Sequence, residues 1–321
     1  MKTVASSGLG KSLHAFSTHS SPLITPSVLW NASVAIYDPY IDKITQIIEY
    51  PGITRSASEH IGGVAWDKWT GLITILVDAA APWATAGADV SGDNLVFKYD
   101  ADAGRILWTS NLTAVSQARY GGFQDIETDK RGNTFVVGTW PGTILKLDKH
   151  GHAEEWFIPE VINTTRAGYG GLAAVGNSDI MLSNDATTGL IYRFDMRDRK
   201  GKPVLVPMTP NHPYLDTDAI YLPPKYGGEV LLVASHASGI QVLRSKDKKW
   251  KTAEYLGTIP NVDTPLFEGS APTAAVQMGS NSLYMIDDWL GDPWVPGQTA
   301  GNRTLFPMPD ITLQVEELLK G

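Results

Sequence analysis

The chain has 321 residues, of which 43% are hydrophobic and 19% are charged, and it contains no cysteine. This composition supports a folded core and excludes a disulfide scaffold, thiol catalysis and cysteine-bound metal centres. The formal charge of −8, without a long basic run, makes nucleic acid and anionic membranes poor partners. No segment approaches the roughly 18 consecutive apolar residues of a membrane span, so we expect none.

Short runs of β-branched and aromatic residues, separated by Gly, Asp and Asn, fill most of the sequence and indicate an all-β protein. The runs recur in a unit of about 45 to 60 residues, the spacing of propeller blades. Each unit begins with an inner strand pair, and these pairs are predicted at 62–77, 121–137, 170–182, 216–233 and 271–286. Outer hairpins are predicted to begin at residues 33, 94, 143, 190 and 240.

These units predict a six-bladed β-propeller of four-stranded antiparallel blades. The chain opens on an outer hairpin and closes on an inner pair followed by an expected strand at 310–315. We therefore expect one blade to be closed by the N- and C-terminal segments, which hides exposed strand edges. Residues 1–28 are assigned to an N-terminal extension and the start of the closing blade, and 29–321 to one propeller domain. An open pair of β-sandwiches is the alternative.

The loops between blades, and those between inner and outer strand pairs, share one face of a propeller. Here they are long and aromatic, above all 80–93 and 289–302, whereas the turns on the other face are short and polar. Long loops on one face of a rigid scaffold often carry function. Trp and Tyr side chains offer flat apolar walls that suit a hydrophobic small molecule. The alternative is that the aromatic residues only pack between blades.

No common catalytic motif is present, whether a zinc-protease helix, a phosphate-binding loop, a serine nucleophile elbow or a calcium-binding EF-hand loop. His60 and His236 flank inner strands and could reach the central channel. Carboxylates at inner-strand ends are Asp216, Asp218, Asp287 and Asp288, with Glu59 and Asp125 nearby. Such oxygens suit calcium, so a metal-dependent lactonase-like hydrolase is one alternative, although turn capping explains several of them equally well.

Four sequons for N-glycosylation occur, at Asn31, Asn111, Asn163 and Asn302. Chance predicts on the order of one or two matches to this motif. The sequence begins without an apolar signal region, yet the sequons favour a glycoprotein of the secretory pathway, or a secreted one, whose signal peptide is absent from this sequence. Coincidence is the competing explanation.

The segment 120–138, which reads YGGFQDIETDKRGNTFVVG, resembles the second-blade signature of six-bladed propellers typified by the Malassezia skin-yeast allergen. The same family includes the trichothecene-cluster accessory proteins of filamentous fungi. The segments 166–172, 215–218 and 231–234 extend the resemblance, which runs from about Val34 to about Val315. These motifs are specific to the fold and say little about chemistry.

The resemblance implies a fungal protein with an apolar ligand cavity. One branch of the family comprises N-glycosylated pericyclases that join a tropolone-derived quinone methide to a humulene-type sesquiterpene by an intermolecular hetero-Diels–Alder [4+2] cycloaddition. The sequons, the aromatic face and the missing hydrolytic constellation fit that branch. A lipid- or terpenoid-binding propeller without catalysis is the alternative of a different class, since fold does not imply function.

A cycloaddition needs no cofactor and no metal, and none is predicted. The expected partners are two apolar small molecules, a polyketide quinone methide and a sesquiterpene, together with N-glycans. The predicted substrate-binding residues are Trp83, Trp140, Tyr169, Asp216, Trp289 and Trp294. The predicted polarising or catalytic residues are Gln124, His236, Asp287 and Tyr120.

Overall fold

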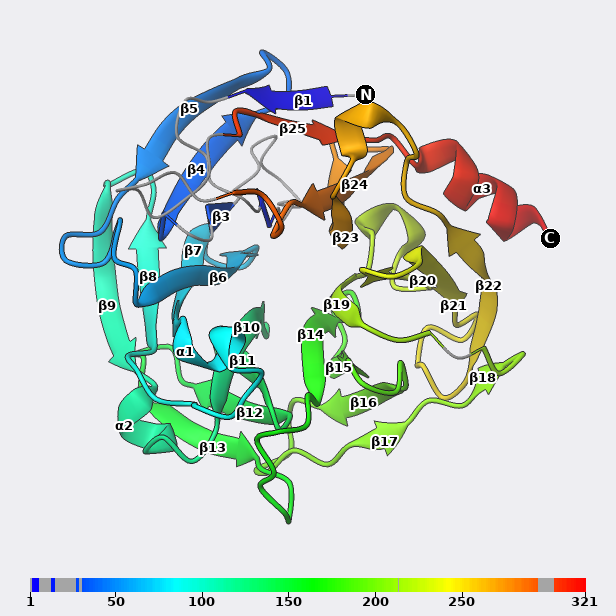
Figure 1. Ribbon diagram of the computed structural model, residues 1–321. Helices are drawn as coiled ribbons and strands as arrows, with labels where there is room; N and C mark the ends of the chain where they lie inside the picture. The colour runs from blue at the N-terminus through cyan, green and yellow to red at the C-terminus, as the bar shows by residue number, and fades with distance from the viewer. Residues whose placement is uncertain (1, 6–12, 15–26, 29–30, 213, 294–302) are drawn as a thin grey trace.

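The computed structural model describes all residues except 1, 6–12, 15–26, 29–30, 213 and 294–302. Its strands form a ring of sheets around a central channel (Figure 1), which confirms the all-β, six-bladed propeller. Each blade runs outward from a strand at the channel, and neighbouring strands within a blade are antiparallel, with one short parallel pair as an exception.

The first four blades are regular four-stranded sheets. The first contains β2 (Leu13–His14), β3 (Ser27–Val28), β4 (Ser33–Asp38) and β5 (Lys43–Ile48). The second contains β6 (Glu59–Asp67), β7 (Leu72–Ala79), β8 (Leu95–Asp100) and β9 (Arg105–Asn111), and the third β10 (Gly121–Thr128), β11 (Thr134–Trp140), β12 (Thr143–Leu147) and β13 (Ala153–Phe157). The fourth contains β14 (Tyr169–Ala174), β15 (Ile180–Asp185), β16 (Ile191–Asp195) and β17 (Val204–Leu205).

The fifth blade has β19 (Thr217–Tyr221), β20 (Val230–Ser235), β21 (Gly239–Arg244) and β22 (Ala253–Ile259), with β18 (Met208–Thr209) parallel to β22. The sixth has β23 (Ala271–Met278) and β24 (Ser282–Asp288), and a two-stranded sheet of β25 (Leu305–Met308) and β1 (Lys2–Ala5) beside it. The helices are α1 (Ala81–Ala84), α2 (Thr113–Ser116) and α3 (Thr312–Lys320), with short 3-10 turns η1 (Pro224–Tyr226) and η2 (Pro265–Phe267).

The closing blade combines both ends of the chain, as the sequence predicts. Strand β1 pairs antiparallel with β25, from Lys2 opposite Met308 to Ala5 opposite Leu305. The division at residue 28 is less simple than predicted, because β2 and β3 pair with β4 and complete the first blade rather than the last. The hairpin that opens at residue 33 therefore belongs to a blade of its own.

The prediction of a strand at 310–315 is wrong: Asp310 forms only an isolated bridge with Tyr284, and helix α3 begins at Thr312. The Asp310 Oδ1 atom accepts a hydrogen bond from the Thr312 backbone N–H at 2.9 Å, a turn that starts the helix. Val315 is then fully buried and packs with Leu318 and Leu319 against the fifth and sixth blades. Apolar and polar residues alternate at 310–315, which favours a strand in the sequence. In the structure, the segment forms a helix instead, because its apolar face packs against the neighbouring sheets.

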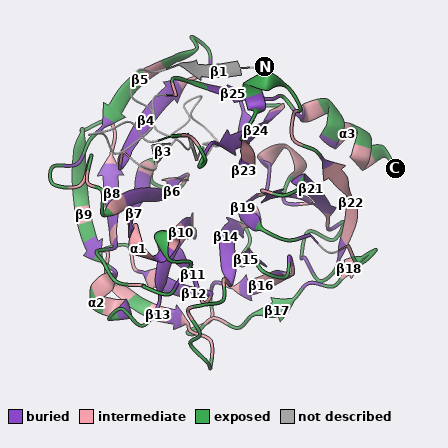
Figure 2. Ribbon diagram, in the orientation of Figure 1, coloured by how far each residue is buried: buried purple, intermediate pink, exposed green. Residues whose placement is uncertain are grey.

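Six hydrophobic clusters of described residues lie between neighbouring blades, and the one between blades six and one also includes Ala219 of blade five. Ala35 and Tyr37 of the first blade share a cluster with Ala274 and Trp289 of the sixth, which closes the ring. Figure 2 shows the resulting distribution, with buried residues along the inner strands and exposed residues on the outermost ones. The hydrophobic core is thus distributed around the ring, between the blades. Polar side chains such as Asp218 and His236 lie at the channel.

A register shift interrupts the innermost strand of blades two to six, near the same height in each. Such β-bulges bend a strand and re-aim its side chains. Glycines accompany several of them because the next blade comes very close: a Cβ on Gly63 would lie 2.9 Å from the Gln124 carbonyl oxygen, and one on Gly171 would lie 2.7 Å from the Ile220 backbone nitrogen. The blades therefore meet by backbone contact around the channel.

We expect Gly171→Ala to lower the free energy of unfolding by about 1–3 kcal/mol, because an added methyl group must push two backbones apart. Chemical denaturation measures the loss. Gly291→Ala is the matched control, since no atom lies within 4 Å of a Cβ there. Equal stability of the two variants would mean that the blades can separate at no cost.

Candidate functional site

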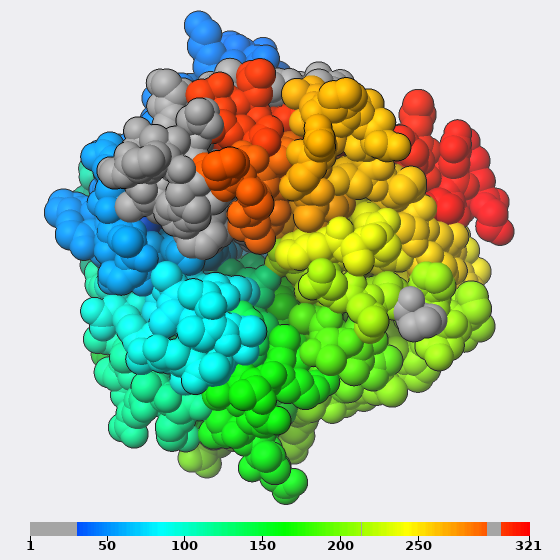
Figure 3. All heavy atoms as spheres, in the orientation of Figure 1, coloured from blue at the N-terminus to red at the C-terminus, as the bar shows by residue number. Residues whose placement is uncertain are grey.

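The loop face of the propeller is hollowed at its centre by a cavity of about 390 Å³ (Figure 3). This volume lies within the usual range for small-molecule sites, roughly 300–1,000 Å³. The cavity is bounded by the ends of inner strands and by inner-to-outer loops from blades two to six. Its lining consists of His60, Gly62, Asp78, Trp83, Ala84, Ala86, Gln124, Thr139, Trp140, Ala167, Ala186, Asp216, Thr217, Asp218, His236, Asp288 and Leu290.

Two tryptophans form an aromatic wall on one side of this cavity. Trp83 lies on α1 and Trp140 ends β11, and their rings meet edge to face with centroids 4.6 Å apart. The Trp83 Nε1–H donates to Asp78 Oδ2, which fixes the indole orientation. Both tryptophans, which the sequence predicts as substrate-binding residues, thus lie in the lining of this cavity.

Asp218 is the centre of a polar network on the cavity floor. Its Oδ1 accepts a hydrogen bond from Gln124 Nε2, and its Oδ2 accepts one from Thr273 Oγ1. The same Oδ2 lies 3.0 Å from His236 Nε2. Gln124 is held in turn by the Thr139 hydroxyl, which donates to Gln124 Oε1 at 2.8 Å. The predicted residues Gln124 and His236 are therefore joined through a carboxylate that was not among the predicted site residues.

His236 carries a proton at neutral pH. Burial lowers its pKa, but the hydrogen bond that its Nε2–H donates to Asp218 and the negative charges of Asp218, Asp288 and Asp216 outweigh burial and raise the pKa to about 9. Asp216 Oδ2 is 3.8 Å from His236 Nδ1, beyond hydrogen-bond distance. The imidazolium therefore keeps its Nδ1–H available to a ligand oxygen.

Asp288, rather than the predicted Asp287, faces the cavity. Successive residues of a strand point to opposite faces, so the two cannot both do so. Asp287 Oδ2 accepts a hydrogen bond from Ser270 at 3.1 Å, and burial raises its pKa to about 6. Burial and the nearby Asp218 raise the pKa of Asp288 to about 7, while the charge of His236 opposes the shift.

Three other predicted site residues lie outside the cavity. Tyr120 is fully buried between blades and its hydroxyl donates to Glu155 at 2.9 Å. Tyr169 packs in the cluster between blades three and four, and Trp289 packs between blades six and one with Arg303 over its ring. Trp294 lies outside the described residues. The aromatic residues beside the inner strands thus serve mostly as the packing between blades.

The remaining predicted residue, Asp216, lies at the cavity rim with its side chain 66% exposed. Its φ is +56°, a conformation that Asp tolerates better than most residues.

Of the sequons, Asn111 and Asn163 are exposed, Asn31 is half-buried and Asn302 lies outside the described residues. Asn163 Oδ1 accepts a hydrogen bond from the Thr165 hydroxyl at 2.8 Å, and the nearby Ala167 lines the cavity.

Asp218, His236 and Asp288 could also hold a divalent cation, because their ligand atoms all lie within 4.8 Å of one another. The oxygen-rich set with one imidazole does not single out a metal. In the present arrangement, His236 is a proton-bearing partner of Asp218, so a cation would have to displace that proton.

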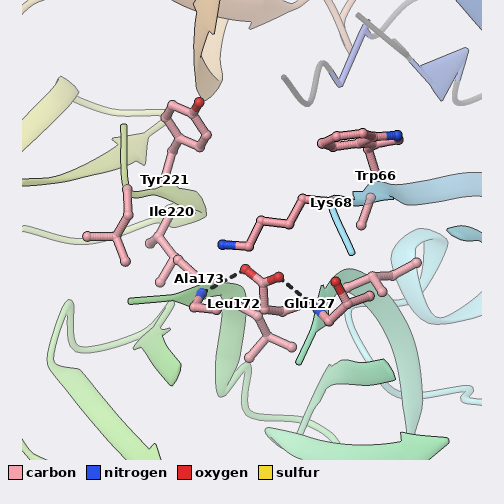
Figure 4. Close-up of a pocket in the computed structure, with 12 residues that line it drawn as sticks. Trp66, Lys68, Glu127, Leu172, Ala173, Ile220 and Tyr221 are labelled. Carbon is pink, nitrogen blue, oxygen red and sulfur yellow. Dashed lines mark hydrogen bonds between the residues drawn. The ribbon is translucent and has the colours of Figure 1, made fainter. Parts of the chain in front are cut away.

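The opposite end of the channel holds a smaller cavity of about 100 Å³ (Figure 4). Glu127 lies at its base, and its two oxygens accept hydrogen bonds from the Thr128 and Ala174 backbone N–H groups, each at 2.7 Å. Lys68 extends beside it and donates to the Gly176 carbonyl at 2.9 Å. With both carboxylate oxygens bonded to backbone, Glu127 ties the third blade to the fourth.

We expect Asp218→Asn to lower the pKa of His236, because the variant removes the anion bonded to Nε2. Titration of the imidazole by NMR measures the shift. Asp216→Asn is the control, and its effect should be smaller because that carboxylate is solvated and farther away. Because folding raises the pKa of His236, its protonation stabilises the folded protein. This stabilisation is complete below the unfolded pKa of about 6.5 and is lost as the pH rises through about 9. An unchanged His236 pKa in Asp218→Asn would contradict the assignment.

No helix of the described chain is long and apolar enough to cross a membrane. No protein-family model matches the sequence. Among solved structures, the fold is similar to the major Malassezia sympodialis allergen Mala s 1, with a TM-score of 0.79 and 17% identity over 96% of this chain and 94% of that one. A luciferin-regenerating enzyme has a TM-score of 0.58 and 13% identity, with 95% and 92% coverage. At these identities the likeness shows the fold alone.

Two curated relatives match nearly the whole chain. Core trichothecene cluster protein 14 of Fusarium sporotrichioides is 27% identical over 311 residues, which cover 91% of this chain and 80% of that protein. Trichothecene biosynthesis protein 14 of Trichoderma arundinaceum is 33% identical over 309 residues, with 91% and 83% coverage. This 33% identity over nearly the whole chain establishes that the chain belongs to the family of trichothecene biosynthesis protein 14.

Proposed function

We propose that the protein is a pericyclase of fungal secondary metabolism. The proposed reaction is an intermolecular hetero-Diels–Alder [4+2] cycloaddition between a tropolone-derived quinone methide and a humulene-type sesquiterpene. The observation that carries the proposal is a cavity in which an aromatic wall and a protonated histidine occur together. Relatives named for a biosynthetic gene cluster support a role in the same kind of metabolism.

The aromatic wall suits the demands of this reaction. A cycloaddition forms its bonds in one concerted step, so the protein must hold two apolar partners in a near-attack arrangement. Trp83 and Trp140 offer flat surfaces for a conjugated ring, and their orientation is fixed by mutual contact and by the bond to Asp78. Exclusion of water protects the quinone methide from addition of water.

His236 can polarise the carbonyl group of the quinone methide. Electron density moves toward the quinone methide carbonyl oxygen as the bonds form, and the imidazolium Nδ1–H can donate to that oxygen. Asp218 keeps the ring charged and oriented. The hydroxyls of Thr139 and Thr217 are both engaged with neighbouring amides, so they do not form a nucleophile and base pair of the hydrolytic kind.

The test is a turnover assay with a quinone-methide precursor and humulenol, with products separated by chiral chromatography against a no-enzyme control. His236→Ala should lower the catalysed rate about 10²–10³-fold, the usual cost of one oxyanion donor. Trp83→Ala and Trp140→Ala should weaken both rate and enantiomer bias. Trp69→Ala is the control, since this exposed tryptophan lies outside the cavity lining.

Unchanged yield and stereochemistry in all cavity variants would refute the site assignment. Binding of a terpenoid without a rate above buffer would instead favour the non-catalytic lipid- or terpenoid-binding propeller. The cluster of Asp218, His236 and Asp288 favours a further candidate, a metal-dependent lactonase-like hydrolase. That candidate requires loss of activity on strong chelation and recovery with added cation, whereas a cycloaddition polarised by His236 should survive chelation.

We also propose that the protein passes through the secretory pathway and carries N-glycans, supported by the exposed side chains of Asn111 and Asn163. Expression in a eukaryotic secretory host should give a product whose mass falls on glycosidase treatment. Asn163→Gln should remove one glycan without changing the fold, while Asn94→Gln, at a buried asparagine outside any sequon, should leave the glycan count unchanged. An unmodified secreted product would contradict the proposal.

A further inference from the structure

Asp78 is a buried carboxyl group in the cavity lining that the argument so far uses only as a support for Trp83. It lies near the end of β7 and is 1% exposed. Its Oδ2 accepts the hydrogen bond from Trp83 Nε1–H, whereas its Oδ1 has no hydrogen-bond partner among the described residues. A buried, unpaired carboxyl oxygen is costly unless it serves a ligand or carries a proton.

The protonation state of Asp78 follows from its surroundings. Burial raises its pKa to about 8, and the hydrogen bonds from Trp83 and from the backbone N–H of Asp78 itself only partly oppose this shift. The group is therefore mainly a neutral acid at pH 7. The carbonyl oxygen of a carboxylic acid is the better acceptor, so the indole bond to Oδ2 leaves the proton on Oδ1. Asp78 thus presents an O–H donor that has no acceptor of its own.

Gly62, which also lines the cavity, lies close to this oxygen. A Cβ on Gly62 would lie 3.1 Å from Asp78 Oδ1, so any other residue would crowd the donor. The donor also lies at the edge of the aromatic wall, because its partner oxygen is bonded to Trp83. A flat ring lying against Trp83 and Trp140 would bring an oxygen on its rim toward Asp78.

We propose that Asp78 acts as a neutral carboxylic acid that donates a hydrogen bond to a ring carbonyl oxygen of the ligand. This selects the oxygen-bearing conjugated partner, not the hydrocarbon-rich sesquiterpene, for the place against Trp83. The inference rests on the proposed function for the reaction, but the binding step can be tested without turnover. A neutral acid keeps its donor in a dry site without the cost of burying a charge.

Several other titratable groups lie on the elements around Asp78, and none of them is hydrogen-bonded to its carboxyl group. His60 is directly opposite on β6, and burial lowers its pKa to about 4, so it is neutral. The other charged or titratable groups on the strands packed against β7, or in the cavity, are Glu59, Asp67, Lys98, Tyr99, Asp100, Asp125, Glu127, Asp216, Asp218, His236 and Asp288. None of them is hydrogen-bonded to Asp78, so burial dominates its titration.

The test measures binding of tropone, a non-ionising seven-membered ring ketone, by calorimetry at pH 7. Asp78→Asn keeps an acceptor for Trp83 and an N–H donor toward the cavity, so its affinity should stay within about threefold of the parent. Asp78→Val removes the donor and should weaken binding about 3- to 10-fold, the usual range for one neutral hydrogen bond. Cycloheptatriene, the same ring without oxygen, should bind both variants alike, which separates loss of the donor from a collapsed cavity.

The pH dependence separates an acid from a base. Tropone binding to the parent should weaken as pH rises through about 8, where Asp78 loses its proton. In Asp78→Asn this weakening should be absent until about pH 9, where His236 titrates. Equal loss of affinity in Asp78→Asn and Asp78→Val, no loss in either, or no tropone binding to the parent would overturn the proposal. Tropone binding that follows the pattern, without any turnover, would refute the pericyclase function alone.

Discussion

The structure depends on the close approach of backbones around the channel. Each bulged inner strand lies against the next blade at a distance that leaves no room for a Cβ at Gly63 or Gly171. This contact brings residues from different blades into one hydrogen-bonded network, so that Gln124 of blade three reaches Asp218 of blade five. The polar floor of the cavity therefore follows directly from the packing of the ring.

The floor combines groups with opposite charge tendencies. Burial pushes Asp78 and Asp288 toward the neutral form, whereas Asp218 is bonded by three donors and keeps His236 charged. Positive charge and acidic protons are thus concentrated beside an aromatic wall. Such an arrangement stabilises electron density that arrives on a ligand oxygen.

Much of the fold could be predicted from sequence because a propeller repeats a local unit, and each unit shows its own strand pattern. Strands β2 and β3 were missed because each has only two residues, too few for a period to be seen. The C-terminal helix was missed because its formation depends on a tertiary contact: Val315 packs against the neighbouring sheets. The aromatic loop face was predictable, and Trp83 and Trp140 were identified on that basis.

The individual site residues were harder to predict because successive side chains of a strand point to opposite faces, so an error of one residue selects the wrong face. That is why Asp287 was chosen where Asp288 faces the cavity. Asp218 was visible as an inner-strand carboxylate, but its central role arises from contacts with Gln124, Thr273 and His236 on three other segments. Tyr120 directly precedes an inner strand and Tyr169 begins one, yet both side chains pack in the hydrophobic clusters between blades. Sequence proximity to a channel is therefore a weak guide to facing it.

The pairing of β1 with β25 has a consequence for biogenesis. Residues 2–5 are synthesised long before their partners at 305–308, so the strand pairing that closes the ring cannot form until residues 305–308 have been made. Pairing over such a separation in sequence carries a high loop-closure entropy and slows folding. Until then, the growing chain exposes the apolar surface between blades one and six, where Tyr37 and Trp289 finally meet in one cluster. Apolar surface that is exposed in this way favours aggregation, so the late closure of the ring is the step at which we expect the unfinished protein to aggregate most readily.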